Sequence, residues 1–401
     1  MTILNVNDLK EFKEQPSEYN TEEELIDWLK WDLYRQTINI SKELGIKLSE
    51  VKDTYLTINI GNENNNYKIN FYFDFLNLLQ LLYNKKIDYE HIFNLKVRFI
   101  NINFDKEFCI QHIVFNNNSI SFINCSFHKS IIFINNYFCG LYFQNIYIEK
   151  SINILFCQAS QLNFSEIKFH NNNSSLNIIG NNFFIDSIIM IKSLYIGSYI
   201  HSGKINLKNL SVEKVDLSNT FIHDCLINPV NFKVHKFANR ESALFLKQQA
   251  YASNNAIDAL QYKAQEVELH KDELIKKKDK TYKDWADILS IQLSSLYSDN
   301  GQNWVKALFM TIFITAFCFT IFYIPDLTKA NIIRLYYKNL FPELIKYFIP
   351  TDYSLIIAYA ASKLNLFLKT FGVLVYFLGK VLFWYGSVQT VQAFRKFSKG
   401  A

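Results

Sequence analysis

Hydrophobic and polar positions along the chain change their period from one stretch to the next. In the first stretch, Thr21 precedes three glutamates, and apolar residues then recur at helical spacing as far as Leu33. A side-chain cap followed by acidic residues is typical of a helix start. Residues 55–60 and 67–71 alternate apolar and polar side chains, as strands do. We therefore predict an N-terminal α/β cap over residues 1–96.

A different period runs from about Val97 to Phe232. Apolar residues come in pairs two positions apart, and the pairs recur at mostly five-residue intervals. Neither a helix nor an ordinary strand meander has this period. Two inward residues per five-residue unit are what a four-sided solenoid requires, with one unit on each face. We expect the phenylalanines at the second inward position to stack along the interior. The pairs include Val97/Phe99, Ile102/Phe104, Phe108/Ile110, Ile113/Phe115, Ile120/Phe122, Ile131/Phe133, Leu141/Phe143, Leu162/Phe164, Ile205/Leu207, Val215/Leu217 and Val230/Phe232.

This five-residue period resembles that of the pentapeptide-repeat family, whose fold is a right-handed quadrilateral parallel β-helix. The resemblance covers about a third of the chain and implies a β-solenoid over residues 97–235. The family favours a small residue, usually alanine, at the first inward position, whereas isoleucine, leucine, valine and cysteine dominate here. We therefore expect coils that are wider, twisted or interrupted. A β-solenoid of another type is the alternative.

Residues 236–303 are predicted to form a helical hairpin and a basic linker. A helical pattern begins at Arg240, breaks at Asn254–Asn255 and resumes from Ala256 to Leu274. One hairpin cannot bury a core alone. We expect it to cap the open end of the solenoid, where strand edges would otherwise be exposed. A peptide-binding groove is the alternative.

Two later stretches have the length and composition of transmembrane helices. Residues 304–324 carry one charge, Lys306 at the edge, and a helix of this length crosses the ~30 Å hydrocarbon core. Residues 365–391 form the second predicted span, residues 325–364 a loop with an interfacial segment, and residues 392–401 a basic tail. The predicted fold class is therefore mixed: a right-handed parallel β-helix, then a helical hairpin and two transmembrane helices.

Small residues and two lysines on these spans are candidates for membrane packing or for lining a pore. Three glycines spaced by seven share one stripe of a helix, where a neighbouring backbone can approach closely. The stripe could pack the two spans of one chain together or join two chains into a homo-oligomer. A lysine near mid-membrane must snorkel, meet a partner or face water. The candidates are Lys380, Lys369, Gly372, Gly379, Gly386, Ala307, Thr311 and Thr315.

Two motifs flank the spans and extend the resemblance. Ser298 to Trp304 (SDNGQNW) and Gln389 to Phe397 (QTVQAFRKF) resemble motifs of bacterial membrane-anchored pentapeptide-repeat proteins. The resemblance implies the bacterial inner (cytoplasmic) membrane. The first residues lack the pattern of a signal peptide, and Arg395, Lys396 and Lys399 follow the second span. By the positive-inside rule we expect both termini in the cytoplasm.

Composition and charge narrow the classes of function. The net charge of +5, from 42 basic and 37 acidic residues, is too balanced for a dedicated nucleic-acid binder. The chain has only 11 glycines and no GxGxxG or GxxxxGK[ST] motif, which argues against a phosphate-cradling loop. Its eight histidines are scattered, without an HExxH or GxSxG motif, and its six cysteines form no CxxC pair. We expect no catalytic, cofactor-binding or metal-binding residues, no cofactor and no enzymatic activity.

These observations lead to three hypotheses about function, of which the third, an enzyme, has no motif to support it. The first is a non-enzymatic inner-membrane protein whose cytoplasmic β-solenoid is a protein-interaction or sensing platform, with the lipid bilayer and a protein as its partners. The alternative is a membrane-perturbing effector or an ion channel gated by the solenoid domain. Lys380 and the glycine stripe suggest the alternative.

Overall fold

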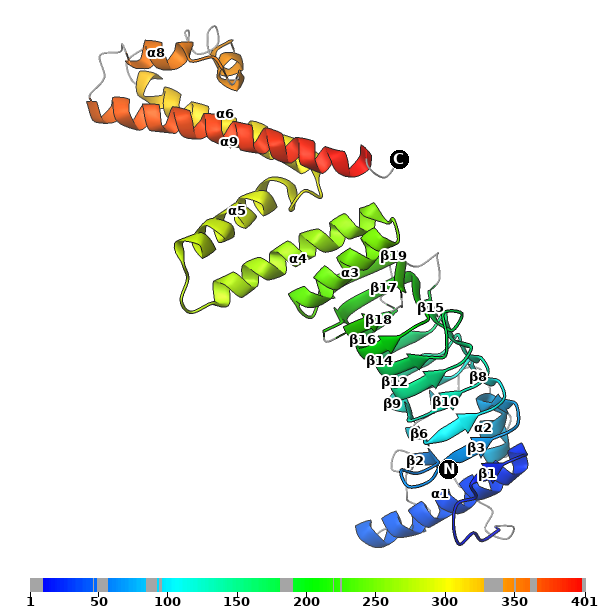
Figure 1. Ribbon diagram of the computed structural model, residues 1–401. Coiled ribbons are helices and arrows are strands. Elements are labelled where there is room, and N and C mark those ends of the chain that lie inside the picture. Colours follow the sequence, from blue (N-terminus) through cyan, green and yellow to red (C-terminus); the bar gives the residue numbers. More distant parts are fainter. Residues whose placement is uncertain are drawn as a thin grey trace. The chain divides into compact units, whose positions relative to one another are not determined.

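The structure is a computed structural model that describes residues 10–45, 47–48, 57–83, 92–93, 96–180, 190–218, 220–223, 226–327, 342–349, 351–360 and 366–398. Figure 1 shows a stack of strands followed in the sequence by helices. The chain divides into two units, Met1–Ala259 and Leu260–Ala401. Cys225, residues 328–341 and the end of the predicted basic tail, residues 399–401, lie outside the described residues.

The first unit is a four-sided parallel β-solenoid, because its strands pair in four separate parallel ladders. We number the four sides faces 1 to 4 in the order in which the chain passes through them. Face 1 stacks Ile58, Val97, Ile120, Leu141, Leu162, Leu194 and Val215. Face 2 begins with the pairs Tyr19–Ile69, Ile69–Phe104 and Phe104–Phe127. Face 3 stacks Phe73, Phe108, Ile131, Ile152, Leu176, Ile205 and Ile227. Face 4 stacks Phe115, Phe138, Ala159, Ile191, Val212 and Val234.

Short strands lie on one face, whereas the longer ones bend around one or two corners onto the following faces. The strands are β1 (Glu18–Tyr19), β2 (Thr57–Ile60), β3 (Tyr67–Ile69), β4 (Phe73–Asp74), β5 (Ile92–Phe93), β6 (Lys96–Ile100), β7 (Ile102–Phe104), β8 (Phe108–Gln111), β9 (Val114–Ile123), β10 (Ser126–Phe127), β11 (Ile131–Ile134), β12 (Tyr137–Ile148), β13 (Ser151–Leu155), β14 (Gln158–Phe169), β15 (Ser175–Ile179), β16 (Ile191–His201), β17 (Lys204–Asp216), β18 (Thr220–His223) and β19 (Leu226–Phe237).

Stacked phenylalanine rings fill much of the interior, as the five-residue period predicts. On face 1, Phe99, Phe122, Phe143 and Phe164 follow one another with ring centroids 4.7, 5.0 and 4.9 Å apart and planes within 6° of parallel. These spacings match the ~4.8 Å between paired strands, so each ring sits one turn above the last. Asn136 occupies one inward position, and its amide is satisfied by the Ile113 N–H at 2.9 Å and the Ile110 carbonyl at 2.8 Å.

Single residues with positive φ form several corners. Their backbone N–H groups donate to the next turn: Asn101 to Ile123 O at 2.9 Å and Asn124 to Gln144 O at 2.9 Å, for example. Asparagine tolerates the left-handed region better than most residues, which explains its abundance between the inward pairs. The described non-glycine corner residues are Asn101, His112, Asn124, Asn135, Asn145, Phe156, Glu166, Ser202, Asn209 and Asn231, with φ between 51° and 62°.

The ladder begins earlier than the five-residue period indicates, and it drifts out of that period at its end. Strands β2 to β5 pair in register with β6 to β9, so the region predicted as a cap contributes to the same sheet. In β19 the inward positions fall on Ile227 and Pro229, which pairs with Leu207, and Val230 is 41% exposed. The predicted pair Val230/Phe232 is therefore wrong at Val230, because the inward pairs of β19 fall at Ile227/Pro229 and Phe232/Val234.

Helices cover both ends of this ladder. Helix α1 (Glu22–Leu44) begins at the cap Thr21, as predicted, buries Leu25 and Leu29, and contacts β1, β2 and α2 (Phe75–Tyr83). At the other end, α3 (Arg240–Ala252) packs on β19. Ser242 Oγ accepts a hydrogen bond from Leu217 N at 2.7 Å, and Gln249 Oε1 accepts one from Ile227 N at 3.2 Å. Side chains of α3 thus satisfy backbone groups of the last turn.

The remaining helices belong wholly or mainly to the second unit. Helix α4 (Ala256–Lys276) crosses the boundary at Ala259, and α5 (Tyr282–Ser298) replaces most of the predicted linker. Helices α6 (Trp304–Leu327) and α9 (Leu366–Ser398) contain stretches long and apolar enough to cross a membrane, Trp304–Phe322 and Leu366–Arg395. Between them lie a short helix at residues 342–348 and α8 (Ser354–Ala360).

Candidate functional site

The two apolar helices pack as an antiparallel hairpin with small residues at their interface. A Cβ atom added at Gly386 would overlap Thr311, and one added at Gly379 would overlap Tyr347 and approach Cys318. Ala307, Thr311 and Thr315 are buried on α6, and each threonine hydroxyl donates to the carbonyl four residues back at 2.6 Å. At Gly372 an added Cβ would overlap the ring of Tyr359. The six small candidate residues therefore all face other parts of the same chain.

Large apolar side chains lie on the outside of this hairpin. Phe309 and Phe313 on α6 are each 66% exposed, and Leu374 and Val381 on α9 are each 63% exposed. A helix pair in water normally buries such residues and exposes its polar ones. Here the arrangement is reversed, with hydroxyls and glycines inside and phenylalanine and leucine outside.

Lys380 sits inside the second unit rather than on its surface. It is 5% exposed, and its ammonium group donates to Tyr347 O at 2.7 Å and to Ile349 O at 2.6 Å. The rings of Tyr347 and Tyr376 lie with their centroids 5.1 and 5.3 Å from Nζ. A lysine surrounded by carbonyls and aromatic faces has its charge compensated within the protein. Lys369, eleven residues away on α9, is half-buried.

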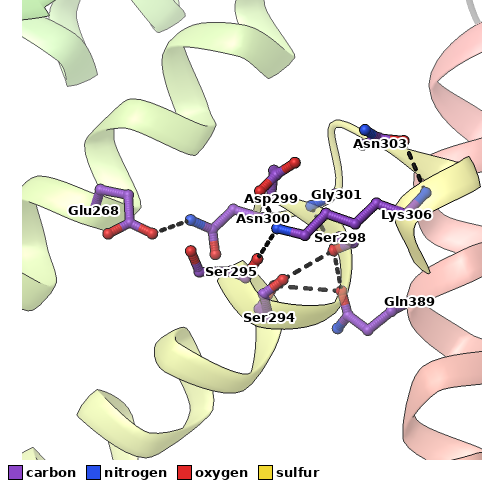
Figure 2. Close-up of polar contacts among 10 residues, drawn as sticks. All are labelled: Glu268, Ser294, Ser295, Ser298, Asp299, Asn300, Gly301, Asn303, Lys306 and Gln389. Atoms are coloured by element: carbon purple, nitrogen blue, oxygen red, sulfur yellow. Dashed lines mark hydrogen bonds and ion pairs between the residues drawn. The ribbon is translucent and has the colours of Figure 1, made fainter. Parts of the chain in front are cut away.

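The two flanking motifs meet at a junction loop, residues 298–303, between α5 and α6 (Figure 2). Gln389 Oε1 on α9 accepts hydrogen bonds from Ser298 Oγ at 2.9 Å and from Ser294 Oγ at 3.3 Å. Ser298 Oγ in turn accepts from Gly301 N at 2.8 Å. The sequence singled out both motifs without indicating that they are in contact.

The shape of the junction loop depends on three successive residues with positive φ. Asp299, Asn300 and Gly301 have φ values of 50°, 54° and 82°. This turn brings Asp299 to Lys306 of α6, whose Nζ lies 2.5 Å from Asp299 Oδ1 and 3.2 Å from Ser295 O. The loop therefore ties the end of α5 to the first turn of α6.

The junction loop also contacts α4 within the second unit. Asn300 Nδ2 donates to Glu268 Oε1 at 2.7 Å, and Gln302 Nε2 donates to Leu260 O at 2.8 Å. Burial raises the pKa of the Glu268 carboxyl, but hydrogen bonds from Lys271 and other neighbours outweigh this effect and leave the pKa below its usual value. Glu268 is therefore ionised at neutral pH. The junction joins α4, α5, α6 and α9 through polar contacts.

The β-solenoid carries a shallow cleft of about 260 Å³ on face 1. Asn163 lies at its centre and pairs with Tyr142 on one neighbouring strand and with Tyr195 on the other. Gln161 and Lys214 complete one side. The two tyrosine rings, with the polar Asn163 between them, form a surface that can contact both apolar and polar groups of a ligand.

Within the described residues, no group of three or more histidine, cysteine, aspartate or glutamate side chains is placed to hold a metal ion. Sequence reasoning missed Tyr347 and Tyr376, which hold Lys380. Tyrosines in apolar segments indicate such contacts, because a buried tyrosine hydroxyl needs a hydrogen-bond partner.

Comparison with known proteins returned no relatives: no family model, curated protein or solved structure matches this chain.

Proposed function

We propose that this chain is a non-enzymatic membrane protein whose β-solenoid presents a surface for binding another protein. The observation that carries the proposal is the reversed hairpin of α6 and α9. Large apolar residues such as Phe309, Phe313 and Leu374 lie outside it, while glycines and threonines lie inside. In lipid, small residues at the interface and apolar residues outside are the expected arrangement.

Exposure of these side chains to water would be costly. Fully burying one phenylalanine or leucine side chain contributes about 1.5–3 kcal/mol. A water-soluble protein rarely leaves a continuous apolar surface of this kind uncovered. The lipid bilayer is therefore the proposed partner of the hairpin.

The proposed orientation follows from the charges near one end of the hairpin. Trp304 and Phe394 are in edge-to-face contact with centroids 5.8 Å apart, so the start of α6 and the end of α9 lie at the same end. Arg395 lies at this end, and Lys396 and Lys399 come shortly after it in the sequence. The positive-inside rule favours the cytoplasm for this end, and hence for both termini. The resemblance to membrane-anchored pentapeptide-repeat proteins favours the inner membrane of a bacterium.

The proposed protein-binding surface is the cleft on face 1 around Asn163. Tyrosine is enriched at protein interfaces because it offers a large apolar surface and one hydroxyl. Tyr142 and Tyr195 provide two such rings on neighbouring turns. No comparable observation favours the ion channel, because Lys380 and the three glycines are engaged within the chain.

A capture experiment from detergent-solubilised membranes tests the proposed binding surface. We expect the double variant Tyr142→Ala/Tyr195→Ala to lose its protein partner by at least about tenfold, as removal of central aromatic anchors does. Tyr137→Ala, on face 4 and half-buried, is the matched control and should retain the partner. Equal recovery with all variants, or no solenoid-dependent partner at all, would exclude this surface.

A further inference from the structure

We propose that residues 342–349 and 351–360 belong to a re-entrant segment that enters the bilayer, turns at the depth of Lys380 and is held there by that lysine. The sequence alone indicates an interfacial location for this stretch, because Pro342, Pro350 and Asp352 interrupt it. The proposal rests on the proposed function, because it requires α6 and α9 to cross the bilayer.

Lys380 lies near the middle of the apolar part of α9. It is fourteen residues from Leu366 and fourteen residues from Phe394, the residue in contact with Trp304. At 1.5 Å per residue this is about 21 Å of helix in each direction. Half of the hydrocarbon core is about 15 Å thick. A spanning α9 therefore places Lys380 well inside the core.

The segment lies beside this central part of α9 and then leaves it. Phe348 contacts Phe383 with ring centroids 5.7 Å apart. Further along the segment, Tyr359 OH donates to Leu368 O at 3.0 Å. Leu368 is fifteen residues from Phe383, or about 22 Å along the helix. Phe348 therefore lies beside the middle of α9, and Tyr359 lies near its first turn.

Three backbone carbonyls of the described residues at the turn accept hydrogen bonds from side chains of α9. Tyr347 O and Ile349 O accept from Lys380 Nζ, and Asp352 O accepts from Tyr376 OH at 2.7 Å. Non-helical backbone is tolerated at membrane depth only where other parts of the protein satisfy it. Side chains of α9 supply these donors, which is the condition that a re-entrant turn must meet.

The charge of Lys380 is compensated by the same segment. Its ammonium group faces carbonyls at the C-terminal end of helix 342–348, where the helix dipole is negative. The Asp352 carboxylate attracts it electrostatically as well. The helix itself carries two charged side chains: Glu343 is partly exposed, and Lys346, one residue before Tyr347, is exposed. The lysine and the segment therefore require each other inside the bilayer.

Cysteine labelling in sealed membrane vesicles of both orientations tests the inference. Single cysteines replace Thr351 in the turn, Leu366 at the start of α9 and Arg395 near its end, and a membrane-impermeant maleimide is added from one side. Labelling is measured above the background of the parent chain, which has six cysteines. We expect Leu366→Cys and Arg395→Cys to react from opposite sides. We expect Thr351→Cys to react slowly from both sides.

Removing the lysine's hydrogen bonds should release the segment. Adding Lys380→Met to Thr351→Cys should raise its labelling rate by about tenfold, as expected from the loss of charge-assisted hydrogen bonds. Lys380→Arg keeps the charge and donors and should preserve slow labelling. Lys369→Met is the matched control on the same helix and should change nothing. Cross-linking of Phe348→Cys with Phe383→Cys should persist in the Lys369→Met chain and fall in the Lys380→Met chain.

The labelling results can contradict the proposed function or the re-entrant segment separately. If Leu366→Cys and Arg395→Cys react from the same side, α9 does not span and the proposed function fails. If they react from opposite sides but Thr351→Cys reacts as fast as Leu366→Cys, the hairpin spans and the segment is interfacial. That second result overturns the re-entrant segment alone.

Discussion

Several corners of the β-solenoid require a left-handed backbone at a single residue, and this limits the residue types that can lie between the inward pairs. A left-handed backbone costs an L-residue about 1–2 kcal/mol, less for asparagine. Asn124 and Asn145 also form a side-chain hydrogen bond at 2.8 Å across neighbouring turns. Phe156 occupies an equivalent corner with φ of 56° and leaves 45% of its surface exposed. It bears the backbone cost without a polar side chain that could offset it.

The backbone cost at this corner can be measured by comparing two replacements of Phe156. Compared with alanine at the same corner, glycine removes the left-handed cost of about 1–2 kcal/mol and adds about 0.5–1 kcal/mol of backbone entropy, so the free energy of unfolding of Phe156→Gly should exceed that of Phe156→Ala by about 0.5–1 kcal/mol. Urea denaturation of the full chain in detergent, followed by far-UV circular dichroism, measures the change. Phe156→Ala keeps the Cβ atom and is the control. Equal midpoints for the two variants would show that the corner is not strained.

Helix α5 shows how a few polar contacts define an element. Thr281 Oγ1 accepts from Asp284 N at 3.2 Å, and Asp284 Oδ2 accepts from Thr281 N at 2.7 Å, so the two residues form a capping box. Lys277 Nζ lies 2.7 Å from the same Asp284 oxygen. The hydrogen bond from Lys277 and those from Thr281 lower the pKa of Asp284 from 3.8 to about 2. The start of α5 is thereby made dependent on one ionised carboxylate.

The contribution of this cap to stability should fall in acid. The pKa of Asp284 is lower in the folded chain than in the unfolded one, so the contribution is fully present above about pH 4 and is lost as the pH falls through about 2. Hydrogen exchange of the Thr281 amide should accelerate over this window beyond the intrinsic pH effect. Asp284→Asn should exchange at a pH-independent excess rate. An unchanged wild-type profile from pH 4 to 2 would contradict the role of the carboxylate.

Elements with a local signal could be predicted, and those that depend on distant partners could not. Thr21 and the Asn254–Asn255 break correctly indicated the start of α1 and the gap between α3 and α4. Helix α5 lies where we predicted a basic linker, because that prediction weighed the lysines at positions 276, 277, 278 and 280 and not the capping box of Thr281 and Asp284. The contacts of Lys380 with residues 347 and 349 join positions more than thirty residues apart, and no repeating pattern in the sequence indicates them.

The two units of the molecule differ in where their large apolar side chains lie. In Met1–Ala259 the apolar residues Phe99, Phe122 and Phe143 are fully inside, whereas in Leu260–Ala401 residues such as Phe309 are largely outside. A single average over the chain conceals this contrast, which explains a mean hydropathy close to zero. The units should therefore respond differently to the removal of lipid or detergent.

Truncation tests this difference directly. A chain ending at Ala259 should remain in the supernatant after ultracentrifugation and should unfold cooperatively in urea, because that unit has its own core. The full chain should stay in the membrane pellet after alkaline carbonate extraction. Release of the full chain by carbonate would argue against anchoring by the hairpin. Aggregation of the shorter chain would show that the solenoid depends on the second unit.

The ladder of the β-solenoid has a consequence for how the chain folds during its synthesis. Most strands pair with one made only 21 to 24 residues earlier, for example Leu162 with Leu141 and Leu176 with Ile152. At about 5–20 residues per second, a ribosome needs a second or more to make such a turn. Loop closure and hairpin formation take microseconds or less. Each turn can therefore settle onto the previous one as it emerges, and the ladder can be complete before translation reaches Trp304 and the first apolar helix.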